Sequence, residues 1–228
     1  MALIIIALLA IAALSFLPSI WVRSVIARHS AERPDFQGTG GEFARYLLNS
    51  MKLESVSVEE TTDGDHYDPA AKAVRLRPEN YGSRSLSAVV IAAHEVGHAM
   101  QDATGYAPLR ARTRLATQAA VIQRVGFAVL LASPLLMLFL RSPVAMVLEI
   151  GAGLILLSLT ILMHVVTLPV EFDASFKRAM PLLREGRLLP EKDIPAARQI
   201  LRAAALTYVA AAALSLLDVM RWFRVLRF

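Results

Sequence analysis

Two histidines and a glutamate near the middle of the chain have the spacing of a metal-dependent hydrolase. They stand in the stretch His94-Glu95-Val96-Gly97-His98. In a helix, residues four apart project from the same face, so both imidazoles can bind one metal ion. Glu95 follows the first histidine and can reach a water molecule at that ion without binding the ion itself. The stretch therefore predicts a zinc hydrolase with His94 and His98 as metal ligands and Glu95 as general base.

The motif lies in a run, residues 85–103, that predicts one helix. Ser85 and Ser87 offer hydroxyls that can cap its beginning, and Gly105 is suited to end it. The residues around the motif are mostly small and apolar, which predicts a buried helix. Buried imidazole and carboxyl groups need partners, and a metal ion provides them. The alternative is a pair of helix histidines that face solvent or neighbouring acids.

Composition indicates a membrane protein of one domain or two small ones. Apolar residues make up 56% of the 228 residues, and the mean hydropathy of +0.51 exceeds that of ordinary soluble domains. The chain has no cysteine, so any zinc must use histidine and carboxylate ligands, which suits a catalytic site. The net charge of +5 would fit nucleic acid in a soluble protein. Because the basic residues flank apolar segments, we expect contact with lipid headgroups of the bilayer and no nucleic-acid partner.

Apolar segments predict an N-terminal anchor and a transmembrane helical hairpin. Residues 1–22 are almost wholly apolar and precede Arg23 and Arg28, which favours an uncleaved anchor over a cleaved signal peptide. Residues 125–170 hold two apolar runs separated by three residues. A connection this short permits only a tight helical hairpin, so the chain returns to the side that it left.

The basic residues predict which side the polar parts occupy. Residues 23–124 carry thirteen lysines and arginines, the hairpin turn carries one, and residues 177–202 carry seven. By the positive-inside rule, we expect the 23–124 part and the C-terminal part, residues 171–228, on the cytoplasmic side. The alanine-rich stretch 203–217 is only fifteen residues long. This length favours a helix that packs on the other helices or inserts only partly into the membrane, and it disfavours a full span.

Residues 23–124, the polar part, predict a small α+β unit. Its own core is thin, so we expect the membrane helices to pack against it and stabilise it. Its expected elements are a helix near residues 43–51, a strand near 53–58, a turn-rich region at 61–69 and a strand at 72–77. A strand just before the metal-binding helix is the usual position for an edge that pairs with an extended peptide.

A basic stretch joins this unit to the hairpin. Residues 108–124 carry four arginines with apolar residues between them: Arg110, Arg112, Arg114 and Arg124. This pattern predicts a helix on the membrane surface that continues into the first span.

A catalytic zinc site also needs a third protein ligand. The candidates are the acids after the motif and the remaining histidines, His29, His66 and His164. Glu171 is the best placed, because the apolar run from residue 144 is about 40 Å long as a helix against a hydrocarbon core of about 30 Å. Its last turns must therefore emerge beside the motif. The alternative is an interfacial acid that pairs with Lys177 or Arg178.

Several separated blocks match a known family in order: Gly64-Asp65-His66-Tyr67-Asp68-Pro69, Val74-Arg75-Leu76, Ser85-Leu86, Ala93-His94-Glu95-Val96-Gly97-His98-Ala99 and Leu168-Pro169-Val170-Glu171-Phe172-Asp173-Ala174-Ser175. Over residues 2 to 215, the chain resembles the YugP-type "putative neutral zinc metallopeptidases" of bacterial membranes. These look like distant relatives of the HtpX and CAAX prenyl protease group. There the third ligand is a glutamate after a membrane hairpin, usually in a Glu-x-x-x-Asp pattern.

The resemblance implies Glu171 as the third ligand of one zinc ion per chain, and a multi-pass protein of the bacterial inner membrane. The sequence departs from the wider pattern at Ser175, where the aspartate that orients a ligand histidine is expected. Asp173 or another acid is the candidate for that role.

Other polar residues are candidates for lesser roles. His66, Tyr67 and Tyr208 could stabilise an oxyanion by chemical type alone. His66 lies among Asp63, Asp65 and Asp68, which favours a hydrogen-bonded turn, and these acids lack the regular spacing of a calcium loop. His164 lies two turns before Glu171 and could line the site, but a role with a partner at the headgroup level is favoured over this. Glu149 is expected to be a polar residue at the outer end of the hairpin, and an intramembrane function is the alternative.

Together these patterns predict a mainly helical α+β membrane protein with a zincin-like helix and a small β-sheet. The leading hypothesis is a membrane-embedded zinc endopeptidase that hydrolyses peptide bonds of membrane or misfolded proteins. One alternative is a catalytically silent zinc-binding membrane scaffold or chaperone-like interaction protein, against which the intact Glu95 argues. Another is a site-2-type intramembrane protease, disfavoured because Arg84 and Asp102 bracket the motif helix in a polar region.

Overall fold

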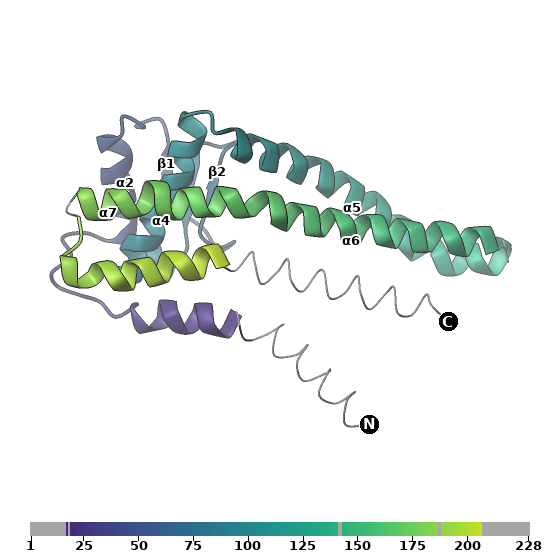
Figure 1. Cartoon of the computed structure of the whole chain (residues 1–228), viewed down its shortest axis with the longest axis horizontal. Coiled ribbons are helices and arrows are strands. Elements are labelled where there is room, and N and C mark those ends of the chain that lie inside the picture. Colours follow the sequence, from purple (N-terminus) through teal and green to yellow (C-terminus); the bar gives the residue numbers. More distant parts are fainter. Residues whose placement is uncertain (1–16, 18, 141–142, 187, 207–228) are drawn as a thin grey trace, which may run out of the picture.

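A compact head of short helices and strands carries a pair of long helices that extend from it (Figure 1). The computed structural model describes residues 17, 19–140, 143–186 and 188–206. Its labelled elements are, in chain order, α2 (Gly40–Ser50), β1 (Ser57–Glu60), β2 (His66–Asp68), β3 (Ala73–Leu76), α3 (Pro78–Tyr81), α4 (Leu86–Ala103), α5 (Ala107–Leu140), α6 (Pro143–Phe172), the π-helix η1 (Asp173–Ala179), α7 (Met180–Glu185) and the 3₁₀ turn η2 (Glu191–Asp193). Residues 19–28 and 194–206 are also helical.

The helix α4 is the predicted helix that carries the histidine motif. The Ser85 hydroxyl accepts a hydrogen bond from the Ala88 amide at its beginning, and Gly105, with φ of +64°, follows its end. Fifteen of its eighteen residues are buried, including both histidines and Glu95. The prediction of one buried helix over residues 85–103 is therefore confirmed.

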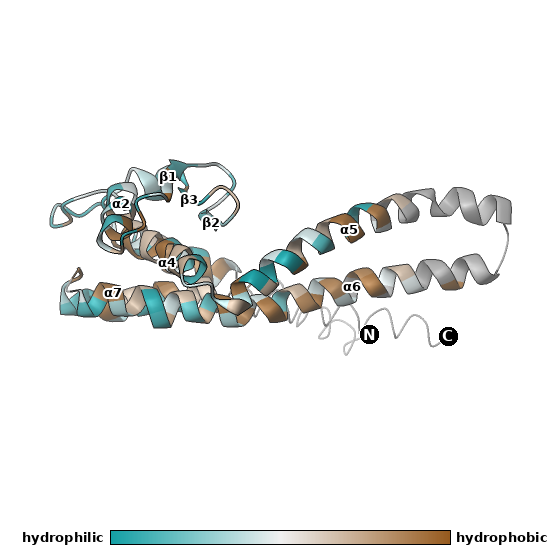
Figure 2. Cartoon of the chain, turned by 90° about the horizontal axis from the view of Figure 1, so that it is seen from above, coloured by the Kyte–Doolittle hydropathy of each residue, from teal (hydrophilic) through white to brown (hydrophobic). Residues whose placement is uncertain are grey.

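A three-stranded mixed sheet covers one side of α4 (Figure 2). The central strand is β3, which pairs in parallel with β1 and antiparallel with β2. Val74 and Leu76 of β3 are fully buried and belong to the same core cluster as Val89 and Val90 of α4. This packing fixes β2 above the histidine motif.

The helices α5 and α6 run side by side as a hairpin (Figures 1 and 2). Gly126 lies in their contact, where an added Cβ would be 2.6 Å from the Leu156 side chain. α6 continues through η1 into α7 without a break. In the described part of the chain, one helix, Gly151–Glu185, is long and apolar enough to cross a membrane.

Helices that precede the hairpin in the chain and helices that follow it complete the core of the head. Val25, from the helix over 19–28, is fully buried, as is Leu183 of α7. Ile200 and Leu201, from the helix over 194–206, pack into the same cluster as α2 and α4. The head therefore draws its core from segments far apart in sequence, in line with the thin core expected for residues 23–124.

Three details of the predicted head differ from the structure. The first strand begins at Ser57 and not near residue 53. The turn-rich stretch 61–69 contains a strand, β2, because Gly64, with φ of +98°, reverses the chain just before it. The strand predicted at 72–77 is β3, which is central, so the expectation that it forms the open edge is wrong. β2 holds that edge.

Other predictions concern residues outside those described. These are the N-terminal anchor up to residue 16, the hairpin turn at 141–142, the end of the 203–217 stretch with Tyr208, and the side chain of Glu149.

Candidate active site

His94, His98 and Glu171 converge in the interior of the head. The Glu171 Oε2 atom lies 3.2 Å from His94 Nε2 and 3.5 Å from His98 Nε2. Two ligand atoms of a tetrahedral zinc ion, each about 2.0–2.1 Å from the metal, are about 3.4 Å apart. Both carboxylate-to-imidazole distances therefore fit a single tetrahedral ion, and all three candidate ligand atoms lie within 4.8 Å of one another. The donor set of two imidazoles and one carboxylate suits zinc.

Hydrogen bonds at the far side of His98 fix its orientation and its tautomer. The Gln101 side-chain amide group donates to the Val170 carbonyl at 2.8 Å and to Asp173 Oδ1 at 2.9 Å. Its Oε1 atom is thereby turned to His98 Nδ1, 3.0 Å away. Because an amide oxygen only accepts, His98 Nδ1 carries the proton and Nε2 keeps its lone pair for a metal.

Ser175 plays the same part for His94. Its hydroxyl lies 3.1 Å from His94 Nδ1 and can donate to the Leu201 carbonyl, 3.5 Å away, so its oxygen can accept the Nδ1 proton when His94 Nε2 binds a metal. Ser175, at the position where an aspartate was expected, therefore contacts a ligand histidine, His94. Asp173, the candidate for that role, instead acts on the other histidine through Gln101, and its carboxylate also accepts from Arg178 at 2.7 Å.

A π-helix and a glycine bring Glu171 up to the histidines. η1 begins two residues after Glu171, and its buried face packs on α4. A Cβ added to Gly97 would lie 2.8 Å from the Ala174 carbonyl oxygen. The π-helical turn and the bare backbone at Gly97 therefore set the distance between the third carboxylate and the motif.

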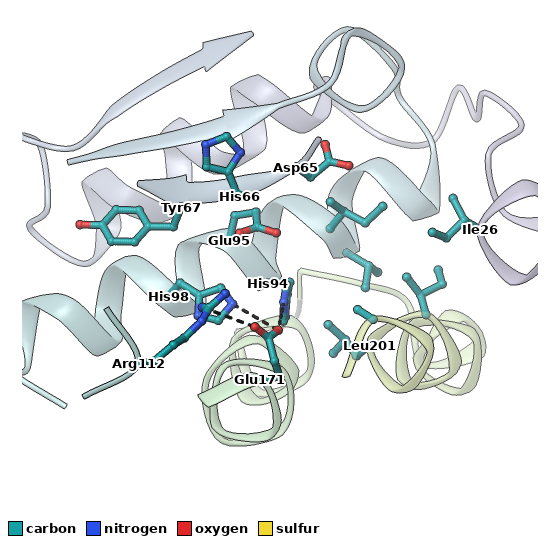
Figure 3. Close-up of a pocket in the computed structure, with 14 residues that line it drawn as sticks. Ile26, Asp65, His66, Tyr67, His94, Glu95, His98, Arg112, Glu171 and Leu201 are labelled. Atoms are coloured by element: carbon teal, nitrogen blue, oxygen red, sulfur yellow. Dashed lines mark hydrogen bonds and ion pairs between the residues drawn. The ribbon is translucent and has the colours of Figure 1, made fainter. Parts of the chain in front are cut away.

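Glu95 lies in the same interior, on the side of the sheet (Figure 3). Only 5% of the residue is exposed, and this burial raises the pKa of its carboxyl group to about 7. A carboxyl group poised near neutral pH is suited to accept and release a proton.

The site opens into a cavity of about 240 Å³ with one polar and one apolar wall. The polar wall carries Asp65, His66 and Tyr67 from β2 and the turn before it, whereas Arg112 from α5 lies on the other side of the motif, beside His98 and Glu171 (Figure 3). The apolar wall combines three helices through Ile26, Val90, Ile91, Ile200, Leu201 and Ala204.

The remaining candidates take other positions. His66 lines the cavity at the start of β2, and its Nδ1 atom lies 2.8 Å from the Gly64 carbonyl oxygen. The Tyr67 hydroxyl donates to Asp102 at 2.6 Å. His29 and His164 are outside the metal-type cluster, which is the one such group found in the residues that the structure describes.

The acids around His66 serve the chain itself. Asp65 accepts hydrogen bonds from the Arg77 amide and from Asn80. Asp68 accepts from the Ala70 and Ala71 amides and from Arg75. These contacts agree with the hydrogen-bonded turn that the sequence favours over a calcium loop.

Two residues of the site were missed in the sequence. Gln101 follows the motif by three residues on the buried face of α4, and a polar residue at that position is the signal that could have drawn notice. Arg112 was assigned with its neighbours to the membrane surface. It instead reaches the site, and its Nη1 atom lies 3.5 Å from Glu171 Oε1. Of the two alternative partners predicted for Glu171, Lys177 and Arg178, the second pairs with Asp173 instead.

Comparison with known proteins shows the family of the chain. Residues 3–227 match the family model described as "Putative neutral zinc metallopeptidase". The chain belongs to this family. It is 37% identical over 215 residues to the "Putative membrane protease YugP" of Bacillus subtilis (strain 168), which covers 93% of this chain and 91% of that protein. No solved structure matches the chain.

Proposed function

We propose that the protein is a membrane-embedded, zinc-dependent endopeptidase. His94, His98 and Glu171 would hold one zinc ion, and Glu95 would act as the general base. The observation that carries the proposal is the convergence of two imidazoles and one carboxylate, with ligand atoms within 4.8 Å of one another, in a cavity that also holds Glu95. Membership of a zinc metallopeptidase family supports the reaction class.

Each residue of the site has a task in peptide hydrolysis. Zinc, when bound, supplies a Lewis acid that polarises a carbonyl group and acidifies a water molecule. Glu95 accepts the proton of the attacking water and passes it to the amide nitrogen as the carbon–nitrogen bond breaks. Ser175 and Gln101 keep both imidazoles oriented with their Nε2 lone pairs toward the site.

The edge strand β2 offers a place for an extended polypeptide. Its one partner among the described strands is β3, and His66 and Tyr67 line the cavity from it. A peptide paired with this edge would pass over the cavity that holds Glu95 and both histidines. We therefore propose unfolded segments of membrane or misfolded proteins as substrates.

The long helical pair supports a location in the bacterial inner membrane. The helix Gly151–Glu185 can span it, and α5 runs alongside as the second arm of a hairpin. With the N-terminal anchor, this would make a multi-pass protein. The basic residues of the head favour a cytoplasmic active site at the membrane surface.

Zinc content and cleavage by the full chain in detergent test the proposal. We expect one zinc ion per chain and cleavage of an unfolded protein such as casein, which Glu95→Gln abolishes without loss of zinc. Glu54→Gln is the matched control, because Glu54 is exposed and outside the cavity. Equal cleavage by wild type and Glu95→Gln would refute the enzyme and leave the zinc-binding scaffold. Full zinc occupancy in Glu171→Ala would remove Glu171 from the ligand set.

A further inference from the structure

Arg112 stands apart from the other arginines of its stretch. Arg110, Arg114 and Arg124 are exposed, whereas the Arg112 side chain is 28% exposed and lines the cavity. It comes from the first arm of the hairpin and meets Glu171 at the base of the second arm. Contact with lipid headgroups would not explain why this side chain lies in the cavity.

The two oxygens of Glu171 face different groups. Oε2 faces both histidines, at 3.2 and 3.5 Å, and Oε1 faces Arg112 Nη1 at 3.5 Å. Arg112 therefore lies next to the carboxylate that would bind zinc, on the hairpin side of the site. Glu95 lies on the sheet side, below His66 (Figure 3).

The charges around the cavity favour a further cation such as the Arg112 guanidinium. A zinc ion with Glu171 and Glu95 ionised has no net charge, and the Asp65 carboxylate in the lining already pairs with Arg77, whose Nε atom lies 3.3 Å from Asp65 Oδ2. Peptide hydrolysis places negative charge on the scissile carbonyl oxygen. Among the described residues that line the cavity, Arg112 alone is a lysine or arginine. Its planar guanidinium keeps its charge at any working pH and donates in a fork, so it can hold Glu171 and a second oxygen together.

We propose that Arg112 is a catalytic residue that stabilises the oxyanion of the hydrolysis reaction. The water oxygen adds to the carbonyl carbon, the π electrons move to the carbonyl oxygen, and Arg112 donates hydrogen bonds to that oxygen. Glu95 takes the water proton and delivers it to the departing nitrogen, and the carbonyl re-forms as that bond breaks. This assignment rests on the proposed function. Loss of one oxyanion donor costs about 10²–10³ in kcat in other enzymes, and we expect a loss of this size here.

The test must separate an oxyanion donor from a residue that only holds Glu171. We would compare wild type, Arg112→Gln and Arg112→Lys in detergent, with Arg114→Gln as the control from the same helix. The readouts are kcat, KM, zinc affinity by competition with a chelator, and calorimetric binding of a phosphinic peptide that mimics the tetrahedral species. We expect Arg112→Gln to lose about 10²–10³ in kcat and a similar factor in phosphinic-peptide binding, with KM and zinc affinity close to wild type. Arg112→Lys should recover part of the loss, and Arg114→Gln should match wild type.

Two results would overturn the assignment. Zinc affinity that falls in Arg112→Gln, with activity restored by added zinc, would make Arg112 a positioning residue for Glu171. Unchanged kcat and phosphinic-peptide binding would remove Arg112 from the reaction. Both results need an active wild type, so they differ from failure of the proposed function, in which wild type itself neither retains zinc nor cleaves.

Discussion

Gly97→Ala tests whether the contact between α4 and η1 sets the geometry of the metal site. The added Cβ would lie 2.8 Å from the Ala174 carbonyl oxygen, and 3.4 Å from its carbonyl carbon and Cα. An ordinary contact begins near 3.4 Å, so the two helices must move apart by about 0.6 Å. The obstacle is backbone, which cannot rotate away as a side chain could. Such overpacking costs about 1–3 kcal/mol, against about 1 kcal/mol gained from the better helix propensity of alanine.

The larger effect should fall on the metal. Glu171 is three residues before Ala174, so a shift of η1 carries the third carboxylate away from both histidines. Ligand distances in a metal site tolerate only about 0.2 Å. We therefore expect zinc affinity to fall by about ten-fold or more, the range seen when groups that support metal ligands are removed. Stability of the metal-free protein should fall by at most about 2 kcal/mol.

Chelator competition for zinc and thermal unfolding of the metal-free protein measure the two effects. Gly153→Ala in α6 is the matched control, because an added Cβ there meets nothing within 4 Å. It should keep wild-type zinc affinity and unfold at the same or a higher temperature. If Gly97→Ala behaves like Gly153→Ala in both assays, the contact with Ala174 does not position Glu171, and this reasoning is wrong.

Three further predictions follow from the described contacts. Ser175→Ala removes the acceptor of the His94 Nδ1 proton and should weaken zinc binding by about 10–100-fold in chelator competition, and Ser175→Thr should recover most of it. In the metal-free protein, burial raises the pKa of Glu95 from 4.5 to about 7, so its contribution to stability is full below pH 4.5 and is lost as pH rises through 7. Denaturant unfolding at pH 8 should therefore show Glu95→Gln more stable than wild type by about 3 kcal/mol, with the difference gone at pH 4.5; a constant difference would contradict this. Thr39→Ala breaks the capping box with Glu42 at the start of α2 and should cost about 1 kcal/mol at any pH, where no change would show that the cap is dispensable.

Patterns of neighbouring residues predicted the helix that carries both histidines, because its bounds depend only on residues close in sequence. The caps at Ser85 and Gly105 predicted the bounds of α4, because they depend on hydrogen bonds between close neighbours. The small strand β2 was missed, since three residues after a glycine turn carry too little pattern to distinguish a strand from a loop. Its role as the edge follows from pairing with β3, which no short stretch of sequence specifies.

The position of Arg112 shows the limit of reading residues by their neighbours. Four arginines at similar spacing look alike in the sequence, and their shared stretch favours the membrane surface. Only the packing of α5 against the base of α6 decides which of the four turns inward to Glu171. The same packing assigns Gln101 to His98 and Ser175 to His94.

The sequence by itself determined that His94 and His98 share one face of a helix with Glu95 between them, because residues four apart in a helix are neighbours whatever surrounds it. The length of the apolar run also made Glu171 the best-placed third ligand, but only the tertiary structure sets its carboxylate, 77 residues after His94, at 3.2 Å from the His94 Nε2 atom. That distance depends on the π-helical turn after Glu171 and on the bare backbone of Gly97 against Ala174. Contacts of this kind arise from how whole helices pack, and no local periodicity encodes them.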